Sequence, residues 1–137
     1  MKKRVVAIIV LFGFTVFLVI PRMIILSPAR NFQITNLDGK PVQNAIVRQV
    51  WYQYSLNLDD KEDFLSGPSG KVTLPERKIK TRNYDLLKGC ISNFKNYFIN
   101  ASCSTSESIG IFSEGYEDVW FYDGEGLNNG IVVVHPV

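Results

Sequence analysis

The sequence predicts a mainly β domain, a small sandwich, that follows an apolar amino-terminal segment. Short runs of alternating apolar and polar side chains are separated by turns rich in glycine and proline, which is the pattern of strands with one buried face. A long apolar run lies within the first thirty residues, and one later stretch repeats apolar residues at helical spacing. The 137-residue chain leaves about 105 residues for the folded part, which is room for one compact core.

The amino-terminal segment has the composition of a membrane-targeting sequence. Three basic side chains lie in residues 1–4, and residues 5–20 contain nothing more polar than Gly13 and Thr15. Residues 23–26 extend the apolar run, so that residues 5–26 as a helix would cross about 30 Å of hydrocarbon. We therefore predict an uncleaved, single-pass N-terminal transmembrane helix, which makes the membrane the first partner of this chain.

The distribution of basic residues predicts which side of the membrane holds the domain. Three precede the apolar run and only Arg22 and Arg30 follow it, which favours a cytoplasmic amino terminus and an extracytoplasmic, periplasmic domain at the inner membrane. Two alternatives stay open: cleavage after Ala29 would secrete the domain, and a buried soluble helix would need no membrane. The chain thus divides into residues 1–30, the anchor or signal segment, and residues 31–137, the domain.

The net charge of +2 conceals an acidic domain. Five of the fifteen basic residues and none of the thirteen acidic residues lie in residues 1–30, so that residues 31–137 carry ten basic and thirteen acidic groups. Nucleic-acid binding needs a basic surface on the folded part. The sequence therefore predicts no nucleic-acid partner.

Two cysteines, Cys90 and Cys103, lie in the part of the chain that we expect outside the cytoplasm. An even number of cysteines in an oxidising compartment predicts a disulfide. Closing a loop with twelve residues between the cysteines would stabilise the fold by about 3 kcal/mol in the chain-entropy model. Unmodified thiols are the alternative, because a metal site would need further ligands and the single histidine, His135, is distant in sequence.

Six strands are predicted from alternation and from β-branched or aromatic content. They cover residues 32–36, 44–56, 71–74, 108–112, 117–122 and 130–135. In the second of them Gln49 interrupts the apolar face that carries Val47 and Trp51, which predicts a bulge or burial on both faces. The acidic run at residues 59–63 is expected to be a solvated loop, because it lacks the glycine and the distal glutamate of an EF-hand calcium site.

Helical spacing marks one segment inside the domain. Apolar residues recur there at intervals of three and four, namely Tyr84, Leu87, Ile91, Phe94 and Phe98. Asn83 is a suitable N-cap for such a helix, whereas Gly89 weakens it. We expect the helix to lie in an insertion, residues 79–106, that also carries both cysteines.

Three motifs mark turns and strand starts. They are DGKPV at residues 38–42 with Ala45 and Val47 on the following strand, SGKVTLP at residues 69–75, and Gly115 with Tyr116 ahead of a late strand. In this order and spacing they resemble the carboxypeptidase regulatory-like family, over residues 31–137. The resemblance implies a fold that looks like transthyretin, a seven-stranded Greek-key sandwich, interrupted here by the helical insertion.

Catalysis is not expected on this scaffold. Enzymes with related sandwiches need several histidines, or two histidines with two tyrosines as iron ligands, and this chain has only His135. It also contains no P-loop, G-x-S-x-G or H-E-x-x-H motif. We therefore predict no enzymatic activity, no metal and no cofactor.

Aromatic residues form the candidate binding site. They are Trp51, Tyr52, Tyr54, Trp120 and Tyr122, which with Phe121 occupy two predicted strands that carry apolar residues in both alternating sets. Because a sandwich buries one face of each strand, some of these rings lie outside the main core. Either the inserted helix covers them, or they form an exposed patch that docks a protein partner.

The predicted function is that of a non-enzymatic, membrane-anchored extracytoplasmic module that recognises a protein. The one-domain design is compatible with an immunity protein that neutralises a toxin. One alternative is a structural accessory subunit of an envelope or secretion assembly, and another is a domain that binds a glycan or small ligand. In each case we expect the working surface in the insertion and on the aromatic strand faces near it.

Overall fold

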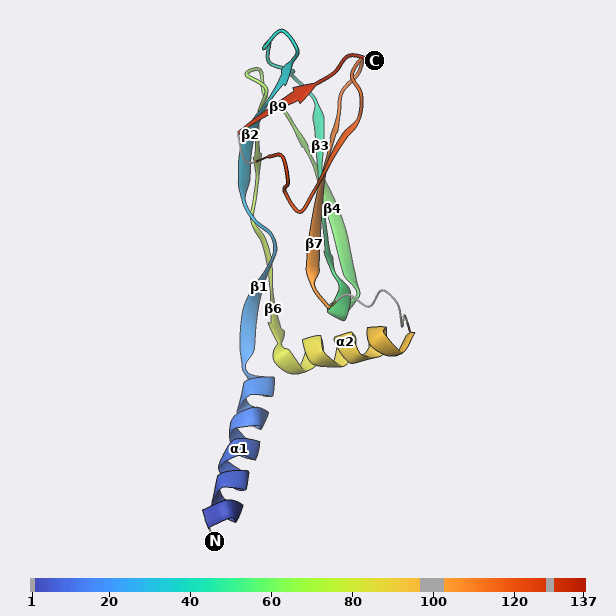
Figure 1. The fold of residues 1–137 in the computed structure, drawn as a ribbon. Coiled ribbons are helices and arrows are strands. Elements are labelled where there is room, and N and C mark those ends of the chain that lie inside the picture. The colour runs from blue at the N-terminus through green and yellow to red at the C-terminus, as the bar shows by residue number, and fades with distance from the viewer. Residues whose placement is uncertain (1, 97–102, 128–129) are drawn as a thin grey trace.

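Nine strands in three sheets, two α-helices and a short 3-10 helix build the part of the chain that this computed structural model describes, residues 2–96, 103–127 and 130–137 (Figure 1). A three-stranded sheet has the order β5-β2-β9, a four-stranded sheet has the order β4-β3-β7-β8, and β1 pairs with β6 in a separate ribbon. The elements are α1 Lys2–Val19, β1 Pro21–Ser27, β2 Arg30–Asn36, β3 Ile46–Gln53, η1 Tyr54–Leu56, β4 Leu58–Leu65, β5 Lys71–Leu74, β6 Arg77–Arg82, α2 Asn83–Asn96, β7 Thr105–Phe112, β8 Val119–Tyr122 and β9 Ile131–Val134.

The predicted seven-stranded Greek-key sandwich behind a transmembrane helix is wrong. The described residues form nine strands in three sheets. Neither helix of the described chain combines the length and the apolar character that a membrane crossing requires. The six predicted strands correspond to β2, β3, β5, β7, β8 and β9, whereas β1, β4 and β6 were not predicted.

The apolar run near the amino terminus divides into a helix and a strand. α1 ends at Val19 and Pro21 follows, a residue that lacks the backbone N–H which a helix interior needs. From there the chain is extended and pairs with β6 in an antiparallel register that starts with Pro21 opposite Arg82. β1, which the apolar run had suggested to be the end of a membrane helix, is therefore part of a sheet.

The core lies between the three-stranded and the four-stranded sheets. Alternate residues of their strands point inward, as the period of a strand dictates. The buried cluster draws on both sheets and on the loops between them: Phe32, Ile34, Val42, Ala45, Val47, Val72, Leu74, Ile109, Ile111, Leu127, Val132 and Val134. Full burial of one such side chain contributes about 1.5–3 kcal/mol, so the two facing sheets form the stable frame of the molecule.

The acidic run that was expected to be a loop is the strand β4. It pairs with β3 over its whole length, although five of its eight residues are charged. β4 lies at the edge of its sheet, where charged side chains discourage pairing with a second chain. Arg48 on β3 lies opposite Asp63 and binds it with an Nε–Oδ1 distance of 2.7 Å, which compensates part of the acidic charge.

α2 lies across one end of the sandwich, next to α1 (Figure 1). The predicted helix and its start at Asn83 are confirmed, while Phe98 lies outside the described residues. Gly89 is required by close packing, because a Cβ at this position would overlap the carbonyl oxygen of Ser55 in η1. The predicted cysteine pair is also confirmed, since Cys90 of α2 is joined to Cys103, two residues before β7.

Candidate functional site

An aromatic-walled hollow lies on the outer face of the four-stranded sheet. Tyr52 and Tyr54 from β3 and η1 line one side, and Trp120 and Tyr122 from β8 line the other. These four side chains are 37% to 66% exposed, and the hollow between them has a volume of ≈ 360 Å³. The rings of Tyr52 and Tyr54 stack with their centroids 6.1 Å apart, so this wall is ordered by ring contacts as well as by the sheet.

Small residues of β7 separate the two aromatic walls. The antiparallel registers place one small residue opposite each of three rings: Ser106 opposite Tyr52, Ser108 opposite Tyr122, and Gly110 opposite Trp120. The Tyr54 hydroxyl lies 3.3 Å from Oγ of Ser106. The hollow therefore combines aromatic sides with a floor that carries hydroxyl groups.

Gly110 allows the Trp120 ring to lie close to the sheet. A Cβ at this position would lie 2.9 Å from atoms of both the Trp120 and the Phe112 rings. These two rings meet edge to face, with centroids 5.4 Å apart and an interplanar angle of 80°. The position of Trp120 is thus fixed by a neighbouring ring and by the absence of a side chain beneath it.

Trp51 does not belong to the hollow. Its side chain is only 7% exposed, and the guanidinium carbon of Arg77 lies 4.9 Å from its ring centroid on the inner side of the sheet. Successive side chains of a strand point to opposite faces, so the predicted aromatic set divides between the two faces of β3. Of the two arrangements left open by the sequence, the structure has the exposed one for Tyr52, Tyr54, Trp120 and Tyr122.

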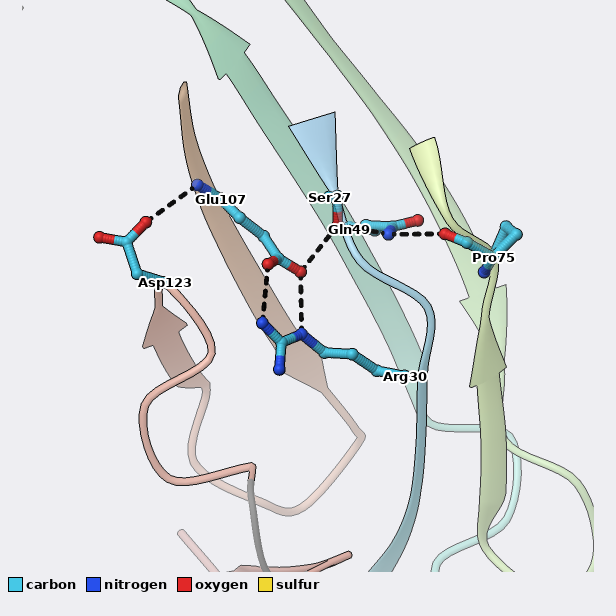
Figure 2. Close-up of polar contacts among 6 residues, drawn as sticks. All are labelled: Ser27, Arg30, Gln49, Pro75, Glu107 and Asp123. Carbon is cyan, nitrogen blue, oxygen red and sulfur yellow. Dashed lines mark hydrogen bonds and ion pairs between the residues drawn. The ribbon is translucent and has the colours of Figure 1, made fainter. Parts of the chain in front are cut away.

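A buried polar cluster lies behind the hollow, on the inner side of the same sheet (Figure 2). Its centre is Glu107 of β7, whose side chain is 5% exposed. The carboxylate accepts hydrogen bonds from Nε and Nη2 of Arg30, at 3.1 and 2.9 Å, and from Oγ of Ser27, at 2.8 Å. Such charge-assisted bonds compensate the desolvation of a buried charge.

Gln49 extends this cluster towards β6. Its Nε2 donates to Oγ of Ser27 at 2.7 Å and to the carbonyl oxygen of Pro75 at 3.1 Å (Figure 2). Nε of Arg77 in turn donates to Oε1 of Gln49 at 3.4 Å, and Arg77 also forms an ion pair with Glu62. Because its members come from all three sheets, the cluster joins the β1–β6 ribbon to the sandwich.

The electrostatics of the cluster are those of a structural ion pair. The hydrogen bond that Arg30 donates to Glu107 raises the pKa of Arg30, against the opposing effect of partial burial. The backbone N–H of Glu107 donates to the carboxylate of Asp123 at 3.2 Å, and the Asp123 N–H donates to the Glu107 carbonyl at 2.8 Å. Within the described chain every buried side-chain nitrogen or oxygen has a hydrogen-bond partner. The polar groups of the cluster are therefore satisfied by hydrogen bonds within the protein.

The hollow on the outer face of the four-stranded sheet carries groups that can stack and form hydrogen bonds. Aromatic sides stack on planar or apolar groups, and the serine hydroxyls of the floor donate or accept hydrogen bonds. In residues 2–96, 103–127 and 130–137 no three His, Cys, Asp or Glu side chains gather as metal ligands. His135 is exposed beyond β9, away from both the hollow and the polar cluster, and its backbone carbonyl accepts from the Glu117 N–H at 2.8 Å.

Glu107, Arg30 and Ser27 were not singled out by the sequence. The polar Gln49 within an apolar strand face was the one sign that the interior holds polar partners. Glu107 itself precedes Ile109 and Ile111 at the inward-facing spacing of two, but the predicted strand began only at Ser108. A strand that began one residue earlier would have included this carboxylate on its inward face.

Comparison of the chain with protein-family models, with curated proteins and with solved structures finds no match. The resemblance to the carboxypeptidase regulatory-like family therefore stays a prediction from three sequence motifs. The function of the hollow has to be inferred from its own geometry.

Proposed function

We propose that this chain is a non-enzymatic binding module that works outside the cytoplasm and recognises a protein partner through the aromatic-walled hollow. The observation that carries the proposal is the set of four half-exposed rings, Tyr52, Tyr54, Trp120 and Tyr122, around one concave surface. Tyrosine and tryptophan are the residues most enriched at the energetic centres of protein interfaces. Their apolar area is removed from water when a partner covers the hollow.

The rigidity of the sheet supports this role. β3 and β7 pair over eight residues each, and their inner side is packed by the core and joined to the other sheets by the Glu107 cluster. Rings held on such a frame lose little conformational freedom when a partner binds, which lowers the entropic cost of association. A binding surface built on strands is also more accurately placed than one built on loops.

The disulfide supports a place outside the cytoplasm. Cys90 and Cys103 are joined in the structure, and bonds of this kind persist in oxidising compartments such as the bacterial periplasm or the extracellular space. The partner is accordingly expected among envelope or secreted proteins.

The test is a binding measurement with the full chain in detergent. Envelope and secreted proteins retained by the immobilised chain are identified, and the affinity of each purified candidate is measured against the unaltered chain and Trp120→Ala. We expect the substitution to weaken binding about 30-fold, as the loss of a central aromatic residue does. Tyr84→Ala is the matched control, because Tyr84 is a similarly exposed aromatic residue that lies on α2 and does not line the hollow.

Two results would contradict the proposal. The first is a partner that binds the unaltered chain and Trp120→Ala equally well, because that partner uses another surface. The second is retention of glycans with no retained protein whose affinity depends on Trp120, in which case the hollow is a carbohydrate site. Aromatic side walls and a hydroxyl-bearing floor also suit a sugar ring, so a panel of glycans belongs in the same experiment.

A further inference from the structure

α2 has one face that packs on the sandwich and one that does not. On the packed face Gly89 lies against Ser55, and Nδ2 of Asn93 donates to the carbonyl oxygen of Tyr54 at 2.6 Å. The disulfide of Cys90 fixes the same side. The outward face carries a row of large apolar residues spaced by three, four and three positions, Tyr84, Leu87, Ile91 and Phe94, which are 45% to 56% exposed.

Lysines border this outward row. Lys88 and Lys95 line a shallow depression together with Tyr84, Leu87 and Ile91. Neither lysine takes part in the ion pairs formed among the described residues, whereas the acidic residue of the first turn, Asp85, is paired with Arg82 at 2.9 Å. An apolar stripe flanked by unneutralised lysines is the composition of a helix that binds an anionic lipid surface.

The apolar surface continues from α2 onto α1. Nδ2 of Asn83 donates to the carbonyl oxygen of Phe17 at 2.9 Å and fixes the two helices against each other. A groove of ≈ 580 Å³ lies between the two helices and the sandwich. Phe14 and Phe17 of α1 and Leu87 of α2 line it, together with residues of β1, β3, η1 and the start of β7. Leu87 also belongs to the outward row of α2, so the two apolar surfaces meet at this residue.

The exposure of α1 favours lipid over a protein as the occupant. Val6, Ile9, Leu11 and Phe12 point in different directions around this helix, and all are more than half exposed. A single protein partner covers one side of such a helix, whereas lipid can contact several sides of it without the helix crossing the bilayer. In Figure 1 α2 begins beside the sandwich-proximal end of α1 and runs away from it across the end of the sandwich, so lipid at this end of α1 also reaches the outward face of α2.

We propose that α2 is an interfacial helix that lies on a lipid bilayer, with Tyr84, Leu87 and Ile91 in the acyl boundary and Lys88 and Lys95 on anionic headgroups. A helix satisfies its own backbone hydrogen bonds and needs only one apolar face for this position. The sandwich then stands on the bilayer with α2 as its base, and β9 lies at the opposite end (Figure 1).

The experiment measures the lipid contact of α2 in the full chain. Two separate variants, Ile91→Trp and Tyr84→Trp, each add a fluorophore to the outward row. Their tryptophan emission is measured in vesicles whose phosphatidylcholine carries bromine near the headgroup. The emission of the unaltered chain is subtracted, so that only the added tryptophan is followed. We expect loss of most of the added emission and a shift to shorter wavelength. Vesicles that also contain phosphatidylglycerol should give stronger quenching, because of the two lysines.

Val133→Trp is the matched control, since Val133 is also β-branched and exposed but lies on β9. Its emission should not be quenched in the same vesicles. The proposal is overturned if vesicles bind the full chain without quenching at positions 84 and 91. It is also overturned if Ile91→Cys forms a disulfide between two copies of the chain in vesicles, because a second copy then covers the row. Equal quenching with and without phosphatidylglycerol would remove the role given to the lysines.

Discussion

Glu107 shows how a single charged residue is accommodated in the interior of a small sandwich. Three donors converge on its carboxylate, two from Arg30 and one from Ser27. A buried ion pair stabilises little compared with an apolar pair, but removing one partner leaves the other charge uncompensated. The cluster therefore contributes more to the arrangement of the three sheets than to total stability.

Glu107→Gln should destabilise the fold strongly. The substitution leaves Arg30, whose side chain is only 19% exposed, without a counter-charge, and we expect the free energy of unfolding to fall by about 3 kcal/mol. Urea unfolding followed by circular dichroism measures the change. Asp63→Asn, which breaks the exposed pair with Arg48, is the comparison and should have a much smaller effect. Equal losses in the two variants would show that the burial of Glu107 has no special importance.

The exposed Arg48–Asp63 pair predicts a small dependence of the free energy of unfolding on pH. The hydrogen bond from Arg48 lowers the pKa of Asp63 in the folded state. Its stabilising contribution is therefore present above the ordinary pKa of an aspartate and is lost as the pH falls through the folded-state pKa. The stability difference between the unaltered chain and Asp63→Asn should be constant above about pH 5 and should vanish in acid. A difference that grows on acidification would contradict this sign.

Gly89 and Gly13 form a matched pair of helical glycines. Alanine at either position improves helix propensity by about 1 kcal/mol, but at Gly89 the new methyl group would overlap the Ser55 backbone, whereas at Gly13 nothing lies within 4 Å. Gly89→Ala should therefore lower the midpoint of thermal unfolding, and Gly13→Ala should not. Unchanged stability in Gly89→Ala would mean that α2 is not held against η1.

At the scale of elements, strands with one apolar face were predictable and strands defined by their partners were not. β5 and β9 carry regular alternation, and their positions follow from it. β4 has low intrinsic strand propensity and exists because β3 offers it eight consecutive partners. β1 lies within a continuous apolar run, so hydrophobicity alone did not distinguish it from a helix. It is a strand because it pairs with β6.

The same distinction applies to the candidate site. The five aromatic residues were identified from the sequence, but their assignment to faces required the register of β3. Trp51 and Tyr52 are adjacent and therefore point to opposite sides of the sheet. The small residues of the floor, Ser108 and Gly110, carry no sequence feature that marks them, because their role arises only from lying between two other strands.

Two truncations test the contribution of β1. A chain that lacks residues 1–20 keeps β1, whereas one that lacks residues 1–29 loses the strand together with buried Leu26 and Ser27. The second truncation also deprives Gln49 of its Ser27 acceptor, and each buried polar group left unpaired costs about 1–3 kcal/mol. We expect the urea midpoint to be retained in the first chain and clearly reduced in the second. Equal midpoints would make β1 an accessory to the fold.

At the scale of the whole molecule, two surfaces lie apart and are held in place differently. The aromatic-walled hollow lies on one face of the four-stranded sheet, and the apolar helices α1 and α2 lie at one end of the sandwich. The hollow is supported from behind by the core and the Glu107 cluster. α2, in contrast, is held by η1, by a hydrogen bond to α1 and by the disulfide, so its attachment depends on the redox state of its surroundings.

Reduction of the disulfide should loosen α2 without unfolding the sandwich. The Cys90–Cys103 bond connects α2 to the chain that leads into β7, and cross-links of this loop length contribute about 3 kcal/mol. Hydrogen exchange with and without reductant measures the effect: amides of α2 should exchange faster in reduced protein, while those of β2 and β9 keep their protection, because their hydrogen bonds lie in the core sheet. Cys90→Ser in the absence of reductant should reproduce the reduced pattern. If β2 and β9 lose protection together with α2, the helix and the sandwich unfold as one cooperative unit.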